Sequence, residues 1–435
     1  MASWREAFDT YRQPRLLAIL FMGFSSGLPL ALTGSTLNYW LREQGISRTA
    51  IGLFSLVGIA YVLKFVWSPI IDHLPIPALT KRLGRRRSWA LAIQVPLALA
   101  ILVLGFTDPA TSPLVTALAA VVVAFLSASQ DIVVDAYRIE LLRPREQGAG
   151  AASTQWGYRF GVLASTVVAL HVEKFGGWSF AYGLMAVFMS VGMLTVWLTP
   201  EPTAELPASP TGDTGTRLRA WLEEAFVAPF ADVFKRPHWV AILLFIVLYK
   251  YGDALAGLMS TPLYVDLGFT TDEVANISKL FGVGATMVGV AAGGLVVARL
   301  GLYTSLLFCG VVQNLATLMY AALAVSGHDL NMLALSVAIE NVTGGMGSAA
   351  FVAYLSRLCT VSFTATQYAL FSALFAFSRI VLSAPGGWLA DRVEWVPFFI
   401  IAAAAGIPGL LVLLRLMRRV PVPAAEKAAP LTRTA

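Results

Sequence analysis

Charged side chains inside strongly apolar stretches are the residues of this sequence whose chemistry most needs an explanation. The stretch "FLSASQDIVVDAYRIELL" (125–142) is apolar enough to cross a membrane, yet it carries Asp131, Asp135, Arg138 and Glu140. An ionised group at the bilayer centre costs at least ~2.5–3.5 kcal/mol, so such groups mark binding or coupling sites. Asp131 and Asp135 share one helix face, where their repulsion favours a proton on one carboxylate.

The same pattern recurs in other apolar stretches. The candidate substrate-binding residues are the charged groups in these stretches and their polar neighbours: Tyr61, Lys64, Gln130, Gln155, Tyr158, Arg159, Lys250, Asp253, Lys279, Glu340, Asn341 and Arg379. The candidate proton-coupling groups are the acids: Asp131, Asp135, Asp253 and Glu340. Because five bases face four acids, the sequence predicts a slightly cationic cavity that suits a carboxylated solute or a sugar.

Two ion pairs are expected among these groups. The helix that carries Arg159 runs antiparallel to the one that carries Asp131, so Arg159 reaches nearly the same depth and is predicted to pair with Asp131 or Asp135. Lys250 and Asp253 are three residues apart on one helix face and form the second expected pair. A purely structural bridge in the first case, and a self-neutralised pair in the second, stay open as alternatives.

Glycine and proline interrupt two of these stretches. Gly252, Gly257 and Pro262 follow Lys250 and predict a broken helix, as transporters use at their binding sites. Glu340 is followed by three glycines, which let a ligand approach closely; close helix packing is the alternative.

A membrane-spanning frame must position these residues. Of the 435 residues, 57% are hydrophobic and 13% charged, whereas soluble domains are about 45–50% apolar and about 25% charged. We expect an all-α integral membrane protein with twelve transmembrane helices near 16–38, 50–71, 88–107, 113–137, 150–171, 178–199, 238–262, 274–298, 303–325, 331–355, 365–385 and 395–417.

Basic residues and a polar linker predict the orientation and the domains. Most Lys and Arg residues fall on the side that carries both termini, which favours cytoplasmic termini, and the net charge of +6 then needs no nucleic-acid partner. The first 15 residues read as a cytoplasmic lead-in and not as a signal peptide. The expected units are a six-helix bundle (1–199), a linker with a short amphipathic helix (200–237), a second six-helix bundle (238–420) and a disordered tail (421–435).

Several kinds of chemistry are not expected. Cys309 and Cys359 fall within predicted helices, so neither a disulfide nor a metal site is predicted. The sequence has no ATP-binding phosphate loop, and its four histidines lack a partnered catalytic motif. We therefore expect no enzyme and no cofactor besides a proton gradient, and a monomer whose partners are the lipid bilayer and a small-molecule substrate.

Two loops resemble those of a known superfamily. "SPIIDHLPIPALTKRLGRRRSW" (68–89) resembles the G-x-x-x-D-[RK]-x-G-R-[RK] loop signature of the major facilitator superfamily, and "RPREQGAGAA" (143–152) resembles its loop after the fourth helix. The hairpins at 41–61 and 264–284 also resemble each other, as expected for a six-plus-six duplication with substrate held between the halves.

This loop resemblance implies a cytoplasmic gate. Its candidate residues are Asp72, Arg85, Arg86, Arg87, Arg138 and Glu140. The arginines are expected to meet acids there, or the free carbonyls at the C-terminus of a neighbouring helix. A purely topological role, as positive charges on the inner side, is the alternative.

Longer stretches resemble the AmpG-type muropeptide permeases. They include "GFSSGLPLALTGSTL" (23–37), "SASQDIVVDAYR" (127–138), "GAGAASTQWGYRFG" (148–161) and "LYKYGDALA" (248–256). The resemblance implies proton-coupled import of N-acetylglucosaminyl-1,6-anhydro-N-acetylmuramyl peptides from the periplasm across a Gram-negative inner membrane. Such import serves peptidoglycan recycling and is linked to β-lactamase induction and so to antibiotic resistance.

The resemblance also assigns roles to residues. Lys64, Arg159 or Lys250 would bind the carboxylates of the peptide, while Asp253 and Glu340, with Asn341, would meet its amines and sugar hydroxyls. The block around Asp131 is shared with the acetyl-CoA transporters. A carrier of acetyl-CoA or another anionic metabolite, in the same superfamily, is therefore the alternative.

Overall fold

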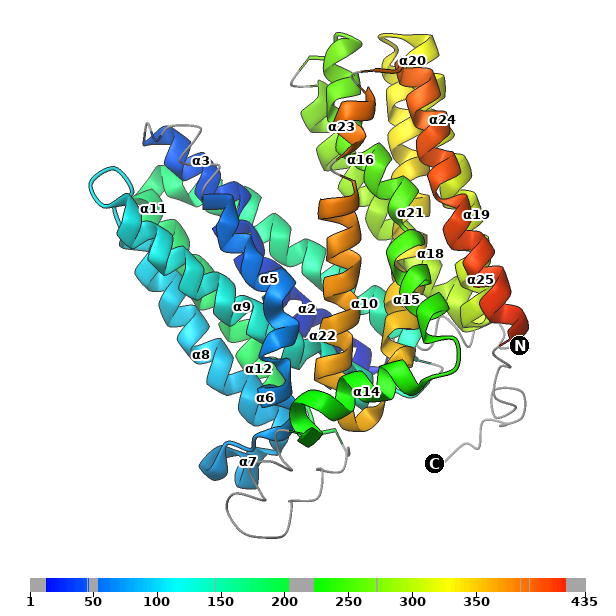
Figure 1. Cartoon of the computed structure of the whole chain (residues 1–435). Helices are drawn as coiled ribbons and strands as arrows, with labels where there is room; N and C mark the ends of the chain where they lie inside the picture. The colour runs from blue at the N-terminus through cyan, green and yellow to red at the C-terminus, as the bar shows by residue number, and fades with distance from the viewer. Residues whose placement is uncertain are drawn as a thin grey trace.

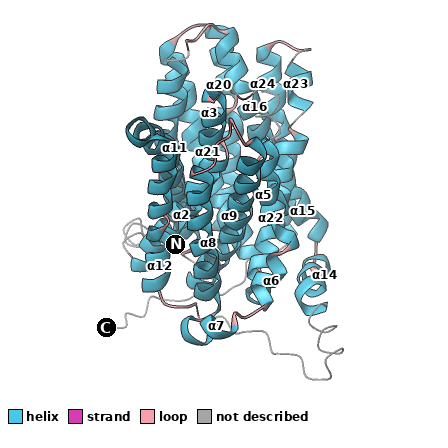
Figure 2. Cartoon of the chain, turned by 90° about the vertical axis from the view of Figure 1, so that its left-hand side faces the viewer, coloured by secondary structure: helices cyan, strands magenta, loops and turns pink. Residues whose placement is uncertain are grey.

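The computed structural model describes residues 13–44, 46, 54–144, 146–202, 223–270, 273–383, 385–390 and 392–419. Within these ranges the chain forms helices and loops only (Figure 2). The N-terminal lead-in, most of the linker before residue 223 and the tail after residue 419 lie outside the described residues. What the sequence predicts for those segments therefore stays a prediction.

The first half of the chain crosses the bundle six times. Its crossings are α2 (Pro14–Thr33) with α3 (Ser35–Glu43); η1 (Ser55–Gly58), α5 (Ile59–Leu63), η2 (Lys64–Val66) and α6 (Ser68–His73); α8 (Arg85–Gly105); α9 (Pro113–Leu141); α10 (Gln147–Leu163), η3 (Ala164–Val168) and the start of α11 (Ala169–Phe188); and the rest of α11 with α12 (Ser190–Leu198). The short helix α7 (Pro77–Leu83) connects α6 to α8.

The second half repeats this pattern (Figure 1). Its crossings are α15 (Trp239–Leu248) with α16 (Tyr251–Asp266); η5 (Val274–Phe281) with α18 (Gly282–Leu300); α19 (Leu302–Ala316) with α20 (Leu318–Ser326); α21 (Leu330–Leu358); η6 (Val361–Phe363), α22 (Thr364–Phe377), η7 (Ser378–Leu382) and α23 (Pro385–Ala390); and α24 (Trp395–Ala405) with α25 (Ile407–Arg419). Before it, η4 (Glu223–Val227) and α14 (Ala228–Lys235) belong to the linker.

Length and hydropathy alone identify fewer spans than this grouping. Eight described helical segments are long and apolar enough to cross a membrane. One of them, Gln147–Leu198, holds two crossings, because Gly177 adopts a φ of 70° and turns the chain. The pair Leu330–Leu358 and Val361–Phe377, bent by 103°, gives two more crossings. The second span is divided into four short helices, and with it the described segments reach the predicted twelve.

The predicted break in the seventh span is present. It separates α15 from α16 at Lys250, where φ is −109° and ψ is 15°. The interruption therefore falls on the charged residue itself, before the glycines and the proline that predict it. Pro262 lies inside α16 and does not end that helix.

The two halves meet at one end of the bundle. We call this the linker end, because α12 ends there and α14 begins there (Figure 1). Ala365 and Ala369 of α22 pack into an apolar cluster of first-half residues, and Ala152 of α10 packs against Val290 and Ala349 of the second half.

Toward the opposite end the two halves diverge (Figure 1). The cluster that contains Trp40 and Trp178, whose rings stack at 5.4 Å, consists of first-half residues only. The cluster that contains Tyr264 and Phe398 consists of second-half residues only. Among the described residues, the apolar contacts between the halves thus fall in the clusters nearer the linker end.

Glycines bring α2 and α10 into direct backbone contact. A Cβ atom at Gly157 would lie 1.8 Å from the carbonyl oxygen of Leu20, and one at Gly27 would lie 2.1 Å from that of Tyr158. Small residues at four-residue spacing allow such close packing between membrane helices. The seam fixes the rotation of α10, and with it the direction of Gln155, Tyr158 and Arg159.

The linker helix α14 packs against the second half. Pro229 and Val233 are its buried residues. On its polar side, Arg236 donates to Asp232 at 2.5 Å and to Thr360 at 2.9 Å, and also contacts the carbonyl oxygen of Leu358. The helix is therefore tied to the turn between α21 and α22. Its contact with the membrane surface stays a prediction.

Candidate functional site

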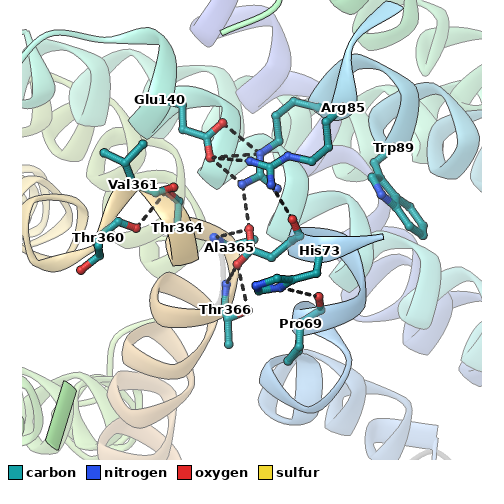
Figure 3. A network of polar contacts seen from close by, with 12 residues as sticks. Pro69, His73, Arg85, Trp89, Glu140, Thr360, Val361, Thr364, Ala365 and Thr366 are labelled. Atoms are coloured by element: carbon teal, nitrogen blue, oxygen red, sulfur yellow. Dashed lines mark hydrogen bonds and ion pairs between the residues drawn. The ribbon is translucent and has the colours of Figure 1, made fainter. Parts of the chain in front are cut away.

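At the linker end, a carboxylate of the first half caps a helix of the second half. Asp72 ends α6, and its oxygens accept hydrogen bonds from the backbone nitrogens of Ala365 at 3.2 Å and of Thr366 at 2.7 Å. The hydroxyl of Thr366 adds a bond at 2.8 Å. These nitrogens belong to the first turn of α22, whose N–H groups have no partner inside the helix. We call these contacts the latch (Figure 3).

Arginines hold the latch carboxylate in place. Arg86 donates to Asp72 at 2.7 Å and to Glu140 at 2.5 Å, and Arg85 donates to the carbonyl oxygen of Asp72. Asp72 is fully buried, so its charge needs a partner, and the Arg86 guanidinium at 2.7 Å provides it. The latch is therefore a buried ion pair that also caps α22.

Both kinds of partner predicted for the arginines are present. Arg85 and Arg86 meet acids, whereas Arg87 donates to the carbonyl oxygens of Val196 at 3.0 Å and Trp197 at 2.6 Å. These two carbonyls lie in the last turn of α12, where the helix dipole favours a cation.

One participant escapes sequence reasoning. Glu201 accepts hydrogen bonds from the backbone nitrogens of Arg86 at 2.7 Å and Arg87 at 3.0 Å and so caps α8. Burial raises the pKa of Glu201, and these two bonds oppose the shift. The residue lies at the start of the polar linker, where its surroundings in the sequence suggest a loop, and only its position after α12 hints at a cap.

Arg138 forms a second contact between the halves, and its surroundings differ from the prediction. We expected it in the loop network with Arg85, Arg86 and Arg87. It instead pairs with Asp135 at 3.5 Å, donates to the hydroxyl of Ser356 in α21 at 2.9 Å and lies 5.4 Å from the ring centre of Tyr368 in α22. The reason is helix geometry: Asp135 lies one turn before Arg138 on the same face. Glu140 does join the arginines as predicted.

The predicted pairing of Arg159 is not formed. Asp135 pairs with Arg138, and the basic group that acts on Asp131 is Lys64 of the second span. The Nε atom of Arg159 has no hydrogen-bond partner among the described residues. Arg159 lies at a suitable depth, but the charged or titratable groups in its electrostatic range are Tyr158 and Arg379 of the second half.

The first-half site therefore centres on Asp131. Lys64 is buried, and Tyr61, from the same span, lies within electrostatic range of Asp131, as does Tyr158 of α10. One carboxylate oxygen of Asp131 is buried without a hydrogen-bond partner. Such a group is free to take up a proton or a ligand.

The second-half site centres on Lys250. Its Nζ atom lies 3.2 Å from Asp253, 3.0 Å from Gln313 and 3.2 Å from the carbonyl oxygen of Gly344. Glu340 is buried and lies in electrostatic range of Asp253 and Lys250. The predicted Lys250–Asp253 pair is present, with a second acid beside it.

A glycine of α21 makes room for this site. A Cβ atom at Gly347 would lie 2.4 Å from Oε1 of Gln313 and 3.6 Å from Nζ of Lys250. Gln313 itself is a partner that the sequence analysis missed, because an isolated glutamine in an apolar helix carries no signal of its own.

The remaining candidates lie in different places. Asn341 is engaged with α18, since it accepts from Thr286 at 2.8 Å. Gln130 is buried inside the first half, 3.5 Å from Ser25, and Gln155 is half-buried on α10. The side chain of Lys279 lies outside the described part of the chain.

These geometries agree with comparisons to known proteins. A family model described as Major Facilitator Superfamily matches residues 19–328. The chain is 44% identical over 406 residues to "Anhydromuropeptide permease" of Escherichia coli (strain K12). The aligned region covers 93% of this chain and 80% of the relative. The chain belongs to the AmpG-type permeases of the major facilitator superfamily.

Other relatives agree with this assignment. The chain is 33% identical over 414 residues to "Putative transporter AmpG 4" of Rickettsia felis, covering 95% of this chain and 99% of the relative. A bacterial homologue of the iron transporter ferroportin, solved in an outward-facing state, matches with a TM-score of 0.68 at 15% identity, covering 94% of this chain and 100% of that chain; at this identity the match concerns the fold. The AmpG-type permease is a multi-pass transporter and not an enzyme, so the predicted fold and family are confirmed.

Proposed function

We propose that this AmpG-type permease imports N-acetylglucosaminyl-1,6-anhydro-N-acetylmuramyl peptides with protons, across a Gram-negative inner membrane with both termini cytoplasmic. The observation that carries the proposal is the 44% identity to an anhydromuropeptide permease over nearly the whole chain. The two sites that place half-buried acids beside buried lysines support the coupling to protons.

The proposed mechanism is alternating access between two rocking units, residues 1–199 and 238–420, in a monomer. The latch holds the linker end closed while the substrate enters from the opposite end. We assign gating to Asp72 and Arg86 with Arg85, Arg87, Glu140 and Arg138. The contact between Arg138 and Ser356 crosses the interface beside the latch and supports this assignment.

Coupling follows from the pairing of acids with bases. When Asp253 is ionised it holds Lys250 at 3.2 Å, so Lys250 is unavailable to another anion. A proton on Asp253 or Glu340 releases Lys250 to bind a carboxylate of the substrate. We propose a similar exchange in the first half, where Asp131 lies in electrostatic range of Lys64. We propose Asp131, Asp135, Asp253 and Glu340 as the groups from which the coupling acid is drawn.

The remaining polar groups between the halves are proposed to contact the substrate. Tyr61, Tyr158 and Gln155 offer hydroxyl and amide groups to sugars. Gln130, Lys279 and Asn341 stay in the proposed set, although Asn341 must first leave Thr286. Arg159 and Arg379 are treated below.

The test is uptake of a labelled anhydromuropeptide into proteoliposomes with an imposed pH gradient. We expect accumulation that a protonophore abolishes, no accumulation of labelled acetyl-CoA, and loss of pH-driven uptake in Asp135→Asn. The matched control is Asp108→Asn, at an exposed acid in the turn before α9. Uptake without dependence on the gradient would refute coupling, and uptake of acetyl-CoA alone would refute the substrate.

A further inference from the structure

Two arginines stand apart from the other intramembrane cations. Among the basic side chains described within the spans, Lys250 has an ion pair with Asp253, and Lys64 lies in range of Asp131. Arg159 and Arg379 make no ion pair with any described residue, although unpaired charges inside a membrane protein are rare.

The two arginines come from different halves and act on each other. Arg159 belongs to α10 and Arg379 to η7, and each guanidinium lies in electrostatic range of the other and of Tyr158. Arg379 is exposed and lies 5.8 Å from the ring centre of Phe375. Asp253 lies in electrostatic range of Arg379 but is already paired with Lys250.

Both arginines lie farther from the linker end than the buried apolar residues that join the halves. Arg159 is twelve residues into α10, or roughly 18 Å from its start at the linker end, and Arg379 is roughly 22 Å from the start of α22. The clusters that connect the halves use residues closer to the starts of these helices, such as Ala152 and Ala365. The arginines therefore lie beyond these clusters and within electrostatic range of each other, one turn past the hydrogen bond from Trp156 to the carbonyl oxygen of Met287.

We propose that Arg159 and Arg379 form a two-sided clamp for the peptide carboxylates of the transported solute. This inference rests on the proposed function and specifies which groups bind the anionic end of that substrate. A guanidinium presents a planar fork of donors that matches a carboxylate, and Arg is always charged. The repulsion between the two arginines favours separated halves, and a bound carboxylate removes that repulsion.

In this proposal the lysines and the arginines have different roles. Lys64 and Lys250 have their own acids and change partner when a proton arrives. The clamp arginines have no acid to release, so their interaction with the carboxylate does not depend on protonation of the protein. Substrate charge is thus sensed by the arginines, and proton charge by the lysine sites.

The test compares two forms of one ligand. Purified full-length transporter in nanodiscs is titrated with a labelled anhydromuropeptide and with the same compound whose peptide carboxylates are amidated. In Arg159→Gln and Arg379→Gln we expect affinity for the free-acid form to fall tenfold to a hundredfold, as for one hydrogen-bonded charge, and affinity for the amidated form to stay unchanged. Arg159→Lys should recover part of the loss. Arg418→Gln, at an exposed residue of α25, is the matched control.

The outcomes separate this inference from the proposed function. Equal loss of both ligand forms, or no loss of either, with melting temperatures equal to wild type, would overturn the clamp while leaving muropeptide transport intact. A wild-type transporter that binds neither form would overturn the proposed function, and the clamp with it. Selective loss of the free-acid form supports both.

Discussion

The latch at the linker end makes a quantitative prediction about conformation. Substitution of Asp72 by Asn keeps the size of the side chain but removes its charge and turns one acceptor into a donor. The amides of Ala365 and Thr366 and the hydroxyl of Thr366 then compete for one neutral oxygen. Because hydrogen bonds to a charged group contribute about 1.5–3 kcal/mol each and are not additive, we estimate a loss of about 2–4 kcal/mol.

That loss should be visible as opening of the linker end. At 1.4 kcal/mol per factor of ten, it shifts the ratio of open to closed molecules by roughly 30-fold to 700-fold. Pulsed EPR measures the shift, with spin labels at the exposed positions Arg82 and Leu300 in a background where Cys309 and Cys359 are serine. We expect a new population of longer distances.

Two controls decide whether the reasoning holds. Asp108→Asn makes the same chemical change at an exposed turn and should leave the distances unchanged. Glu140→Gln weakens the latch only indirectly, through Arg86, so it should open the linker end less than Asp72→Asn does. An unchanged distance distribution in Asp72→Asn, or equal opening in Glu140→Gln, would refute the latch.

Three further predictions concern the second half and the linker helix α14 that packs against it. Gly347→Ala places a Cβ atom 2.4 Å from Oε1 of Gln313, which costs about 1–3 kcal/mol of overpacking. We expect uptake to fall roughly tenfold or more at normal expression. The control is Gly284→Ala, where a Cβ atom meets no heavy atom within 4 Å and uptake should stay unchanged. Arg236→Gln removes the bonds of α14 to the α21–α22 turn and should lower the melting temperature by about 1 °C per kcal/mol lost, measured by differential scanning fluorimetry. Burial raises the pKa of Asp232, but hydrogen bonds, that of Arg236 first among them, lower this pKa by more than burial raises it. The ionised carboxylate therefore stabilises the fold above about pH 4, and this stabilisation is lost as pH falls through the depressed pKa. Acid should accordingly lower the melting temperature of wild type more than that of Arg236→Gln.

Hydropathy predicts the spans well because a bilayer demands about 20 apolar residues per crossing, whatever their partners. The sequence also predicts a break in the seventh span, because Gly252 weakens the helix near Lys250. The sequence cannot predict the partner of Arg159, because that depends on the rotation of α10, which the contacts of Gly157 and Gly27 with neighbouring backbone determine. Depth follows from residue number, but direction follows from packing.

The caps of the gate illustrate the same limit. Glu201 and Thr366 meet their partners across 115 and 294 positions of the chain. Neither residue type is unusual in its own segment, so only the assembled helix ends reveal them. Asp72 was predictable because the loop signature marks it, but its helix partner, α22, was not.

The latch and the clamp have opposite effects on the free energy of the conformational change that transport requires. A transporter that moves from 1% to 99% in one state needs about 5.5 kcal/mol of differential binding. Two charge-assisted hydrogen bonds from Arg159 and Arg379, at about 1.5–3 kcal/mol each, supply roughly 3–6 kcal/mol if they form fully only when the halves approach. The latch, at about 2–4 kcal/mol, opposes the motion by a comparable amount. Substrate alone therefore sits close to the threshold, and protonation of the acids beside Lys64 or Lys250 is what we expect to carry the equilibrium across it.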